Sequence, residues 1–504
     1  MGYKIVVLDI GKTNKKLFVY DSNLRCLNPD EEGTQFDPVT WETPSGLELE
    51  CDDMESIRHW MIQGLRDVGE KYDDIRAISI STHGATIAML GEQQDRVFPG
   101  DGGLVFPIIS YENDVGQEAD EAFYEDIGMT PEEAQRSTAT PRLSWFLNHA
   151  KLIHFLQERA PSRWQDVSDI LMFPQYVAYL LTDEMGVEPT YLGCHGYLLD
   201  SSGQSYSAIA DRLGATDLLP DLPFSNSWDV LGNLKPGLAE ETGISEDCVV
   251  TMGAHDSNLA LVPYLAQGID NFVVQDSGTW VVTMAPLKDG EAEFADEELG
   301  REVFFNRDIY GDPVKTTIFR GGAEFDFYRS NVLDNKPRPK DMDRSVMQEL
   351  VEGQKVFSLP TIERGAGLFP DSVAKLEGID TIFRDASTAW HVIDLGLAVQ
   401  GWYALQLAAG ENPHQVFIEG NIGQHNPIYR SVISALFHDA QVRYGSMGGA
   451  AFGAAILGAA AVEEVRPEEL ADRYEIVLQD IEDLGVDHEA LRDYVQAFIE
   501  RLEE

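Results

Sequence analysis

Cysteine is scarce in this sequence, with four residues in a chain of 504. The four are far apart and form no Cys-x-x-Cys pair, so neither a zinc ribbon nor a disulfide framework is expected. They are Cys26, Cys51, Cys194 and Cys248.

Long hydrophobic runs are missing as well. The longest nearly apolar stretch, from Gly448 to Val462, is too short and too rich in glycine and alanine to cross a bilayer. The first residues run straight into a strand pattern, without the basic segment and apolar stretch that form a secretory signal. We therefore expect a cytoplasmic protein.

Basic residues are also few. Lys and Arg total 37 against 86 Asp and Glu, for a formal net charge of −49. Nucleic acids need a basic footprint and anionic membranes attract basic segments, so neither partner is expected. The simplest interpretation is an acidic, highly soluble surface. An anionic ligand would then need a bound cation, helix N-termini and backbone N–H groups.

The chain is rich in hydrophobic residues, at 43%, and long. A single core stops growing at roughly 250–300 residues, so the length predicts two domains. Helical and strand patterns alternate throughout, which predicts the α/β class. We place the boundary between residues 1–262 and 263–504.

A hairpin with a polar tip opens the sequence. Residues 4–10 and 15–20 have strand patterns, and the turn between them reads Gly-Lys-Thr-Asn. Backbone N–H groups at such a tip can bind phosphate oxygens. Asp9, at the end of the first strand, suits a Mg²⁺ ligand, and Lys12 or Lys15 could add positive charge. The alternative is an ordinary surface hairpin.

The same pattern recurs half a chain later. Strand patterns at 271–275 and 280–284 flank Asp-Ser-Gly-Thr at 276–279. The repetition indicates an internal duplication. Two such tips facing one another across a cleft would hold a polyphosphate from both sides.

Two further strands end in polar residues. The strand at 248–252 leads into Gly-Ala-His-Asp, where Asp256 would face the crevice in which α/β sheets bind ligands. A carboxylate there can accept the proton of an attacking hydroxyl, and its alternative role is to cap a helix at 257–266. The strand at 75–81 leads into Thr-His-Gly, where His83 could bind a sugar hydroxyl or be purely structural.

Other segments carry weaker signals. Tyr111, Glu112 and Asn113 follow an expected strand, VFPIIS, and could contact hydroxyls or be ordinary loop residues. The turn 421–426 and the small-residue run 448–455 suit adenine and ribose, although tight helix packing explains the run equally well. Helices are expected at 53–71, 141–158, 173–182, 391–409 and 427–438, with an acidic helical tail over the last 40 residues.

The order of these motifs resembles the FGGY family of carbohydrate kinases, within the actin/hexokinase-like ATPase superfamily. The resemblance runs from Asp9 to about Ala460 and includes Phe-Pro-Gln-Tyr at 173–176. It implies two actin-like (ribonuclease H-like) domains, each a mixed sheet flanked by helices, that close over a cleft. Residues 1–262 would bind the sugar and carry the first phosphate loop, and 263–504 would bind the nucleotide.

The resemblance also implies cofactors and single-residue roles. ATP and Mg²⁺ would serve phosphoryl transfer to a ketose, deoxyketose or polyol, with Asp256 as the base and Asp9 at the metal. The nucleotide would contact Gly11, Lys12, Thr13, Lys15, Ser277, Gly278, Thr279, Gly420, Asn421, Asn426, Gly448 and Gly449. The sugar would contact Thr82, His83, Gly84, Glu112, His255 and Asp256.

Some positions depart from the family pattern. The Trp, Asp and Arg that usually contact the acceptor are absent, and Tyr111–Asn113 stands there instead, which argues against a standard xylulose or glycerol assignment. Lys12, Asn14 and Asn421 are also unusual. Residues 188–196 are loosely similar to rhamnulose and fuculose kinases, which favours a deoxyketose or related ketose. The alternatives are an inactive sugar- or nucleotide-binding regulator and another ATPase of the superfamily; a homodimer stays open.

Overall fold

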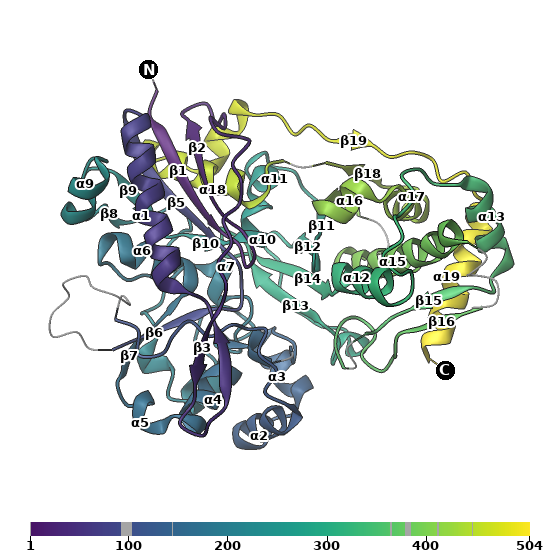
Figure 1. The fold of residues 1–504 in the computed structure, drawn as a ribbon, viewed down its shortest axis with the longest axis horizontal. Coiled ribbons are helices and arrows are strands. Elements are labelled where there is room, and N and C mark those ends of the chain that lie inside the picture. The colour runs from purple at the N-terminus through teal and green to yellow at the C-terminus, as the bar shows by residue number, and fades with distance from the viewer. Residues whose placement is uncertain are drawn as a thin grey trace.

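The computed structural model describes residues 2–91, 103–143, 145–362, 365–378, 385–410, 413–445 and 447–503. These residues form two halves, each built on a mixed β-sheet flanked by helices, and the halves meet along one side (Figure 1). The predicted α/β class is confirmed.

The first sheet has the strand order β2-β1-β5-β9-β8, with β10 paired to β5. The β1–β2 pair is antiparallel, β1–β5 and β5–β9 are parallel, and β9–β8 is antiparallel. Most residues of the central strands are buried, as their apolar sequences require. The strands are β1 (Lys4–Ile10), β2 (Lys15–Asp21), β5 (Ile75–Thr82), β8 (Val230–Asn233), β9 (Val249–Thr251) and β10 (Ala254–His255).

The second sheet has the order β13-β14-β12-β11-β17-β18-β19. Its run β12-β11-β17-β18-β19 repeats the antiparallel, parallel, parallel, antiparallel sequence of the first sheet. This shared topology agrees with the predicted duplication. The strands are β11 (Phe272–Ser277), β12 (Val281–Pro286), β13 (Val303–Arg307), β14 (Pro313–Phe319), β17 (Gln415–Glu419), β18 (Gln441–Tyr444) and β19 (Gln479–Asp480).

The helices of the first half largely follow the predicted pattern. Helices predicted at 53–71 and 173–182 are confirmed as α1 and the fully buried α6. The helix predicted at 141–158 begins only at His149, because the Asn148 side chain caps it by accepting the N–H of Ala150. The helices are α1 (Met54–Lys71), α2 (Gln117–Ile127), α3 (Pro131–Thr138), α4 (His149–Arg159), α5 (Pro161–Trp164), α6 (Phe173–Thr182), α7 (Pro189–Leu192), α8 (Ala208–Arg212) and α9 (Pro236–Thr242).

The central helix of the second half is α15. It is long and apolar enough to cross a membrane by length and composition, but 72% of its apolar window is buried inside the protein, where it packs on β11, β12 and β14. It is therefore a core helix. The helices here are α12 (Gly321–Asn331), α13 (Arg344–Gly353), α15 (Ala386–Ala409), α16 (Gly420–His425), α17 (Pro427–Leu436) and α19 (His488–Glu503). Small antiparallel pairs are β3 (Val39–Glu42) with β4 (Glu48–Cys51), β6 (Ile87–Gly91) with β7 (Val167–Met172), and β15 (Phe357–Leu359) with β16 (Lys375–Glu377).

Helix α18 (Gly449–Glu463) belongs to the second half by sequence but packs against β1 and β5 of the first sheet. A Cβ on Gly453 would lie 2.0 Å from the carbonyl oxygen of Leu259, and one on Gly458 would lie 2.7 Å from Ile5 Cγ2. Only glycine permits this approach. Beyond its first residues, the small-residue run therefore serves helix packing.

Four expectations were wrong. Residues 421–426 lie almost wholly in α16 instead of a turn. Residues 105–110 form no strand; this stretch has an isolated bridge between Ile109 and Cys51 and a few single backbone hydrogen bonds, such as that from Val105 to Met89. The helix expected at 257–266 is divided into α10 (Asp256–Leu259) and α11 (Val262–Ala266), because Pro263 lacks an N–H and starts a new helix. The C-terminal tail is helical only in part, since a 3₁₀ segment and β19 precede α19.

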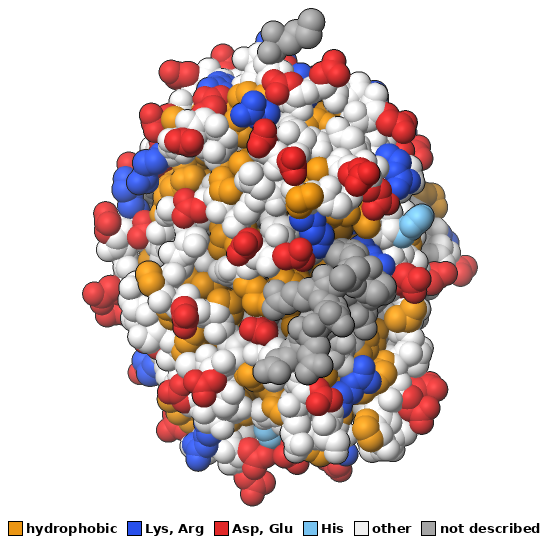
Figure 2. Space-filling view, turned by 90° about the vertical axis from the view of Figure 1, so that its left-hand side faces the viewer, with side chains coloured by type: hydrophobic (Ala, Val, Ile, Leu, Met, Phe, Trp, Pro, Cys, Tyr) orange, Lys and Arg blue, Asp and Glu red, His pale blue; other side chains and the backbone are white. Residues whose placement is uncertain are grey.

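The surface reflects the charge of the sequence. Figure 2 looks onto the first half, where Asp and Glu side chains are scattered across the whole face. Lys and Arg occur between them singly or in small groups.

Candidate active site

Three carboxylates meet where the two sheets adjoin. Asp9 is the next-to-last residue of β1, Asp276 is the next-to-last residue of β11, and Asp256 is the first residue of α10. Burial raises the pKa of both Asp9 and Asp276 to about 6, and the charge of Asp256 raises each pKa further. Asp256 itself stays 32% exposed. The arrangement concentrates negative charge and leaves one carboxylate accessible.

The register of the first sheet places two of these acids. Asp9 on β1 pairs with Ser81 on β5, whose hydroxyl donates a 2.8 Å hydrogen bond to Asp9 Oδ1. Ala254 on β10 pairs with the same Ser81, so Asp256 follows two residues beyond. Parallel neighbours bring their carboxyl ends to one edge of the sheet, which is why residues 9 and 256 become neighbours.

Asp256 is held in place locally. Its Oδ1 accepts the N–H of Ser257 at 2.6 Å and lies 3.4 Å from His255 Nε2. The other ring nitrogen, His255 Nδ1, lies 2.7 Å from Asn258 Oδ1. The amide of Asn258 donates to the carbonyl of Arg307 at 2.5 Å, so its oxygen is the acceptor.

These contacts decide the tautomer of His255. Because Asn258 Oδ1 accepts, His255 Nδ1 must carry a proton, which leaves Nε2 as the ring nitrogen that could accept a hydrogen bond from a ligand. A ligand hydroxyl beside His255 Nε2 and Asp256 Oδ1, which lie 3.4 Å apart, could donate its one proton to either of them.

A second pair of acceptors lies beside His83. Burial lowers the pKa of His83 to about 4, so the ring is neutral at physiological pH. Its Nδ1 donates to the carbonyl of Gly84 at 3.0 Å, which leaves Nε2 as an acceptor 3.9 Å from Asp52 Oδ2. Among the described residues, Asp52 Oδ2 has no hydrogen-bond partner although it is buried.

The first hairpin tip is tightly folded. The N–H of Gly11 donates to the carbonyl of Asn14 at 3.0 Å. The side chain of Lys12 binds other residues of the first half: its Nζ donates to Asp52 Oδ1 at 2.8 Å and to Ser110 Oγ at 2.9 Å. The buried Lys15 donates to the carbonyl of Lys12 at 2.9 Å, and burial lowers its pKa. Both ammonium groups therefore form hydrogen bonds with residues of the first half. Thr13 is exposed at the tip of the hairpin.

The second hairpin is joined to α16. The hydroxyl of Ser277 donates to the carbonyl of Glu419 at 2.5 Å and accepts the N–H of Gly423 at 2.7 Å. Gly420 has a φ of +79°, and a Cβ there would lie 2.4 Å from Asp276 Oδ1. The close approach of two backbones thus requires glycine. Gly278 and Thr279 form the partly exposed tip.

The remaining predicted nucleotide residues differ in accessibility. Asn421 and Gly448 are exposed, and Gly449 has a φ of +58° with open space around it. Asn426 is buried and fully engaged, since its oxygen caps α17 at Tyr429 and its amide donates to Asp394 at 2.8 Å. Asn426 therefore shapes the loop.

The residues predicted to contact the sugar also differ in accessibility. The hydroxyl of the buried Thr82 donates to the carbonyl of His83, so it supports the strand end. Gly84 has no room for a side chain: a Cβ would lie 2.5 Å from His255 Nε2 and 2.8 Å from His195 Nε2. Glu112 is exposed, whereas the ring of Tyr111 packs 5.9 Å from that of His83.

The sequence interpretation missed several residues of this region. Asp276 was visible as the repeat of Asp9 but was not assigned a role. Asp52, at the start of α1, and His195, after α7, carried no local signal because only the tertiary fold brings them to His83 and His255. Arg320 lies over the ring of Trp280 at 5.6 Å and adds a cation near the second hairpin.

A separate cavity of about 810 Å³ lies between α2, α4 and the loop at 300–302. Its walls contain Arg142 and Lys151, which both bind Asp120. None of the site residues predicted from the sequence lines it, so it is distinct from the carboxylate centre.

Comparison with known proteins identifies the family. The FGGY family of carbohydrate kinases, N-terminal domain, matches residues 4–263, and the carbohydrate kinase FGGY C-terminal domain matches residues 270–467. The chain therefore belongs to the FGGY family of carbohydrate kinases, as the motif order predicted.

Individual relatives agree with this. The chain is 27% identical over 146 residues to a probable L-xylulose kinase of Pasteurella multocida, covering 28% of this chain and 30% of the relative. It is 26% identical over 159 residues to the L-xylulose/3-keto-L-gulonate kinase of Escherichia coli, covering 30% and 31%. The matched segments thus span less than a third of either relative.

The fold is shared over the whole chain. A carbohydrate kinase from Novosphingobium aromaticivorans superposes with a TM-score of 0.77 at 24% identity, covering 100% of this chain and 98% of that structure. The two-sheet architecture is thus that of known FGGY kinases.

Proposed function

We infer that this protein transfers the γ-phosphoryl group of Mg-ATP to a hydroxyl of a ketose, deoxyketose or polyol, with Asp256 as the general base. The observation that carries this proposal is the pair of acceptors at His255 Nε2 and Asp256 Oδ1, 3.4 Å apart. A hydroxyl that lies between them can donate to the carboxylate, which then removes its proton as the oxygen attacks phosphorus.

The second acceptor pair favours a polyhydroxylated substrate. His83 Nε2 and Asp52 Oδ2 need a donor of their own, and a second hydroxyl of the same molecule supplies it. A neutral imidazole such as that of His83 suits this task, because it accepts a hydrogen bond without attracting the phosphate of the product. We assign His83, His255 and Asp52 to sugar binding, with Tyr111 as the neighbouring wall.

The residues present fit a magnesium-bound nucleotide. Asp9 and Asp276 are half-buried acids whose pKa values are raised first by loss of solvent and then by the charge of Asp256, and a divalent cation would offset both effects. Asp9 and Asp276 would hold Mg²⁺, which when bound neutralises charge on the transferred phosphoryl group. The two hairpin tips would contact phosphates through backbone N–H groups, and Gly420 with Asn421 and the start of α18 would border the adenosine.

The names of the relatives reduce the number of candidate acceptor sugars. Two that match are named for L-xylulose, and one of these also for 3-keto-L-gulonate. We propose a ketose as the acceptor and place L-xylulose and deoxyketoses first among candidates. Residues 1–262 would form the sugar domain and 263–504 the nucleotide domain, joined by α18, in an enzyme of the cytoplasm where ATP is available.

The test is ADP release by the purified protein with Mg-ATP, screened against ketoses, deoxyketoses, pentitols, keto-acids and glycerol. Strong stimulation by one compound is expected. ATP binding without stimulation by any of them would favour a non-catalytic regulator and overturn the proposal.

A further inference from the structure

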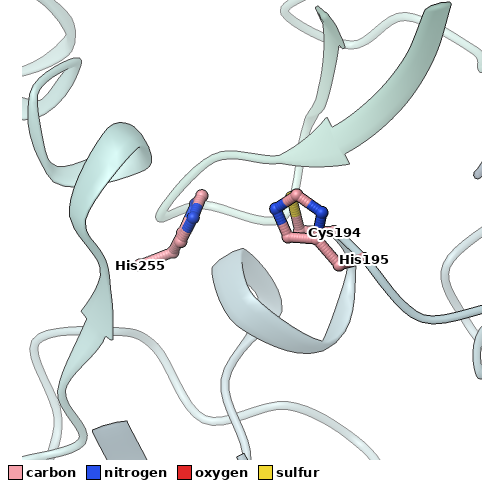
Figure 3. A group of neighbouring side chains, drawn as sticks. All are labelled: Cys194, His195 and His255. Atoms are coloured by element: carbon pink, nitrogen blue, oxygen red, sulfur yellow. The ribbon is translucent and has the colours of Figure 1, made fainter. Parts of the chain in front are cut away.

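We propose that Cys194, His195 and His255 form a binding site for a borderline-soft transition-metal ion of the Zn²⁺ type. One ligand atom from each residue lies within 4.8 Å of the other two. Figure 3 shows the ring of His255 on one side and Cys194 with His195 on the other. This site is distinct from the proposed Mg²⁺ ligands Asp9 and Asp276.

The three side chains come from two rigid segments. Cys194 and His195 follow α7, where the carbonyl of Cys194 accepts the hydroxyl of Thr140 at 3.1 Å. His255 ends β10, and its N–H donates to Thr190 Oγ1 at 3.1 Å. The rings of His195 and His255 lie edge to face, with centroids 5.6 Å apart. The backbone therefore holds the donors together before any ion binds.

The hydrogen bonds of His255 prepare it as a ligand. Its Nδ1 proton is donated to Asn258 Oδ1, so the lone pair of Nε2 is directed away from that partner. Metal-bound histidines almost always donate their other ring nitrogen in this way. His195 turns its Nε2 toward the same point as His255, since a Cβ on Gly84 would lie 2.8 Å from His195 Nε2 and 2.5 Å from His255 Nε2. A cation between the two rings could therefore bind the Nε2 atom of each.

The donor set selects the ion. A thiolate with two imidazoles suits Zn²⁺ or Co²⁺, whereas Mg²⁺ prefers oxygen ligands. Bonds of about 2.0–2.3 Å place tetrahedral donors roughly 3.3–3.7 Å apart, so shifts of about 1 Å in these side chains close the site. On binding, the Cys194 thiol releases its proton to solvent as the sulfur–metal bond forms.

Asp256 could supply the fourth ligand of the ion. Asp256 Oδ1 lies 3.4 Å from His255 Nε2, which is about the separation of two donors on one tetrahedral ion. The ion would then occupy the atoms proposed to hold the acceptor hydroxyl. Resting on the proposed function, this predicts that Zn²⁺ inhibits turnover in competition with the sugar.

Cobalt absorption tests the site directly. Chelator-treated protein is titrated with Co²⁺, and we expect one equivalent to produce a thiolate-to-cobalt charge-transfer band with tetrahedral d–d bands, both removed by Zn²⁺. Cys194→Ser should lose the charge-transfer band. Cys248→Ser, another buried cysteine outside the cluster, should keep it.

A second variant tests the site in case Cys194→Ser fails to fold. His195→Gln leaves the thiol in place and should weaken Co²⁺ binding by about tenfold or more, with circular dichroism confirming the fold. Absence of the charge-transfer band in folded wild-type protein, or its survival in Cys194→Ser, overturns the site. A protein that shows the band but phosphorylates nothing would overturn the proposed function and leave the site standing.

Discussion

Asp9 and Asp276 occupy the same position in two copies of one hairpin. Each is the next-to-last residue of a first strand, each is half-buried, and the pKa of each is raised to about 6 by loss of solvent with a contribution from Asp256. Two hairpins of the same pattern thus place an acid each where the charge of Asp256 acts on it. The predictions below follow from this arrangement.

Replacing Asp256 by Asn should abolish most turnover and leave binding intact. The amide keeps the shape but cannot accept the proton of the hydroxyl, so kcat should fall by a factor of order 10²–10⁴. Steady-state kinetics and calorimetric titration with ATP and sugar measure the two effects. Asp439→Asn, at an 80% exposed acid, is the control that should change neither. Near-normal kcat in Asp256→Asn would remove Asp256 from the role of base.

Replacing Asp9 or Asp276 by Ala should raise the Mg²⁺ requirement. Each variant removes one proposed oxygen ligand, and we expect half-saturation to move to roughly tenfold higher Mg²⁺, with activity partly restored at high concentration. The measurement is rate against free Mg²⁺ at constant ATP. An unchanged Mg²⁺ dependence in both variants would contradict a metal role for these carboxylates.

The same two acids predict how Mg²⁺ and pH act together on stability. Both pKa values lie above the ordinary 3.8, so the folded state keeps protons that the unfolded chain has already lost. The stability that comes from these protons is complete below a pH of about 4 and disappears as pH rises to about 6. Above that pH the site is charged, and Mg²⁺ should stabilise the protein most.

Thermal unfolding with and without Mg²⁺ checks this linkage. The increase in Tm caused by Mg²⁺ should be larger at pH of about 7.5 than at about 5. The double variant Asp9→Asn, Asp276→Asn should lose the difference. A Mg²⁺ effect that is equal at both pH values in the wild type would show that these carboxyls do not titrate with the ion.

Adding one methyl group at Gly84 should damage sugar use selectively. A Cβ there would lie 2.5 Å from His255 Nε2 and 2.8 Å from His195 Nε2, so both rings must move, at a cost of about 1–3 kcal/mol. We expect the KM for sugar to rise about tenfold or more with little change in the KM for ATP. Gly237→Ala, which meets nothing within 4 Å, is the matched control. Equal effects on both substrates would place Gly84 outside the sugar site.

Gly420→Ala should impair nucleotide binding. The new Cβ would lie 2.4 Å from Asp276 Oδ1, and the φ of +79° strains any side chain. Gly268→Ala shares the positive φ of +68° but meets nothing within 4 Å, so it measures strain alone. We expect the KM for ATP to rise in Gly420→Ala only. If both variants behave alike, backbone strain and not the contact with Asp276 is responsible.

Much of the fold was predictable because local patterns are strong. The buried strands β1, β5 and β11, the helices α1 and α6, and the repeated hairpin all lie where apolar periodicity places them. Boundaries set by single side chains were harder. The side chain of Asn148 caps α4 and so delays its start, and Pro263 divides the expected helix in two.

The candidate site was predictable only in part. Asp9, His83, Asp256 and the second hairpin stand at strand ends, where a motif reveals them. Lys12 and Lys15 carry the right charge, but the structure turns Lys12 toward Asp52 and Lys15 toward a loop carbonyl. Orientation depends on neighbours distant in sequence.

The sequence by itself determined the class, the family and the acid proposed as base, because strand patterns and the residues at their ends are local properties. Only the tertiary structure decided the partners of those residues. The bare nitrogen of His255 follows from Asn258 and Arg307, and the approach of His195 requires α7 to pack against β10. Hydrogen-bond geometry between segments is a property of packing, and no stretch of sequence encodes it alone.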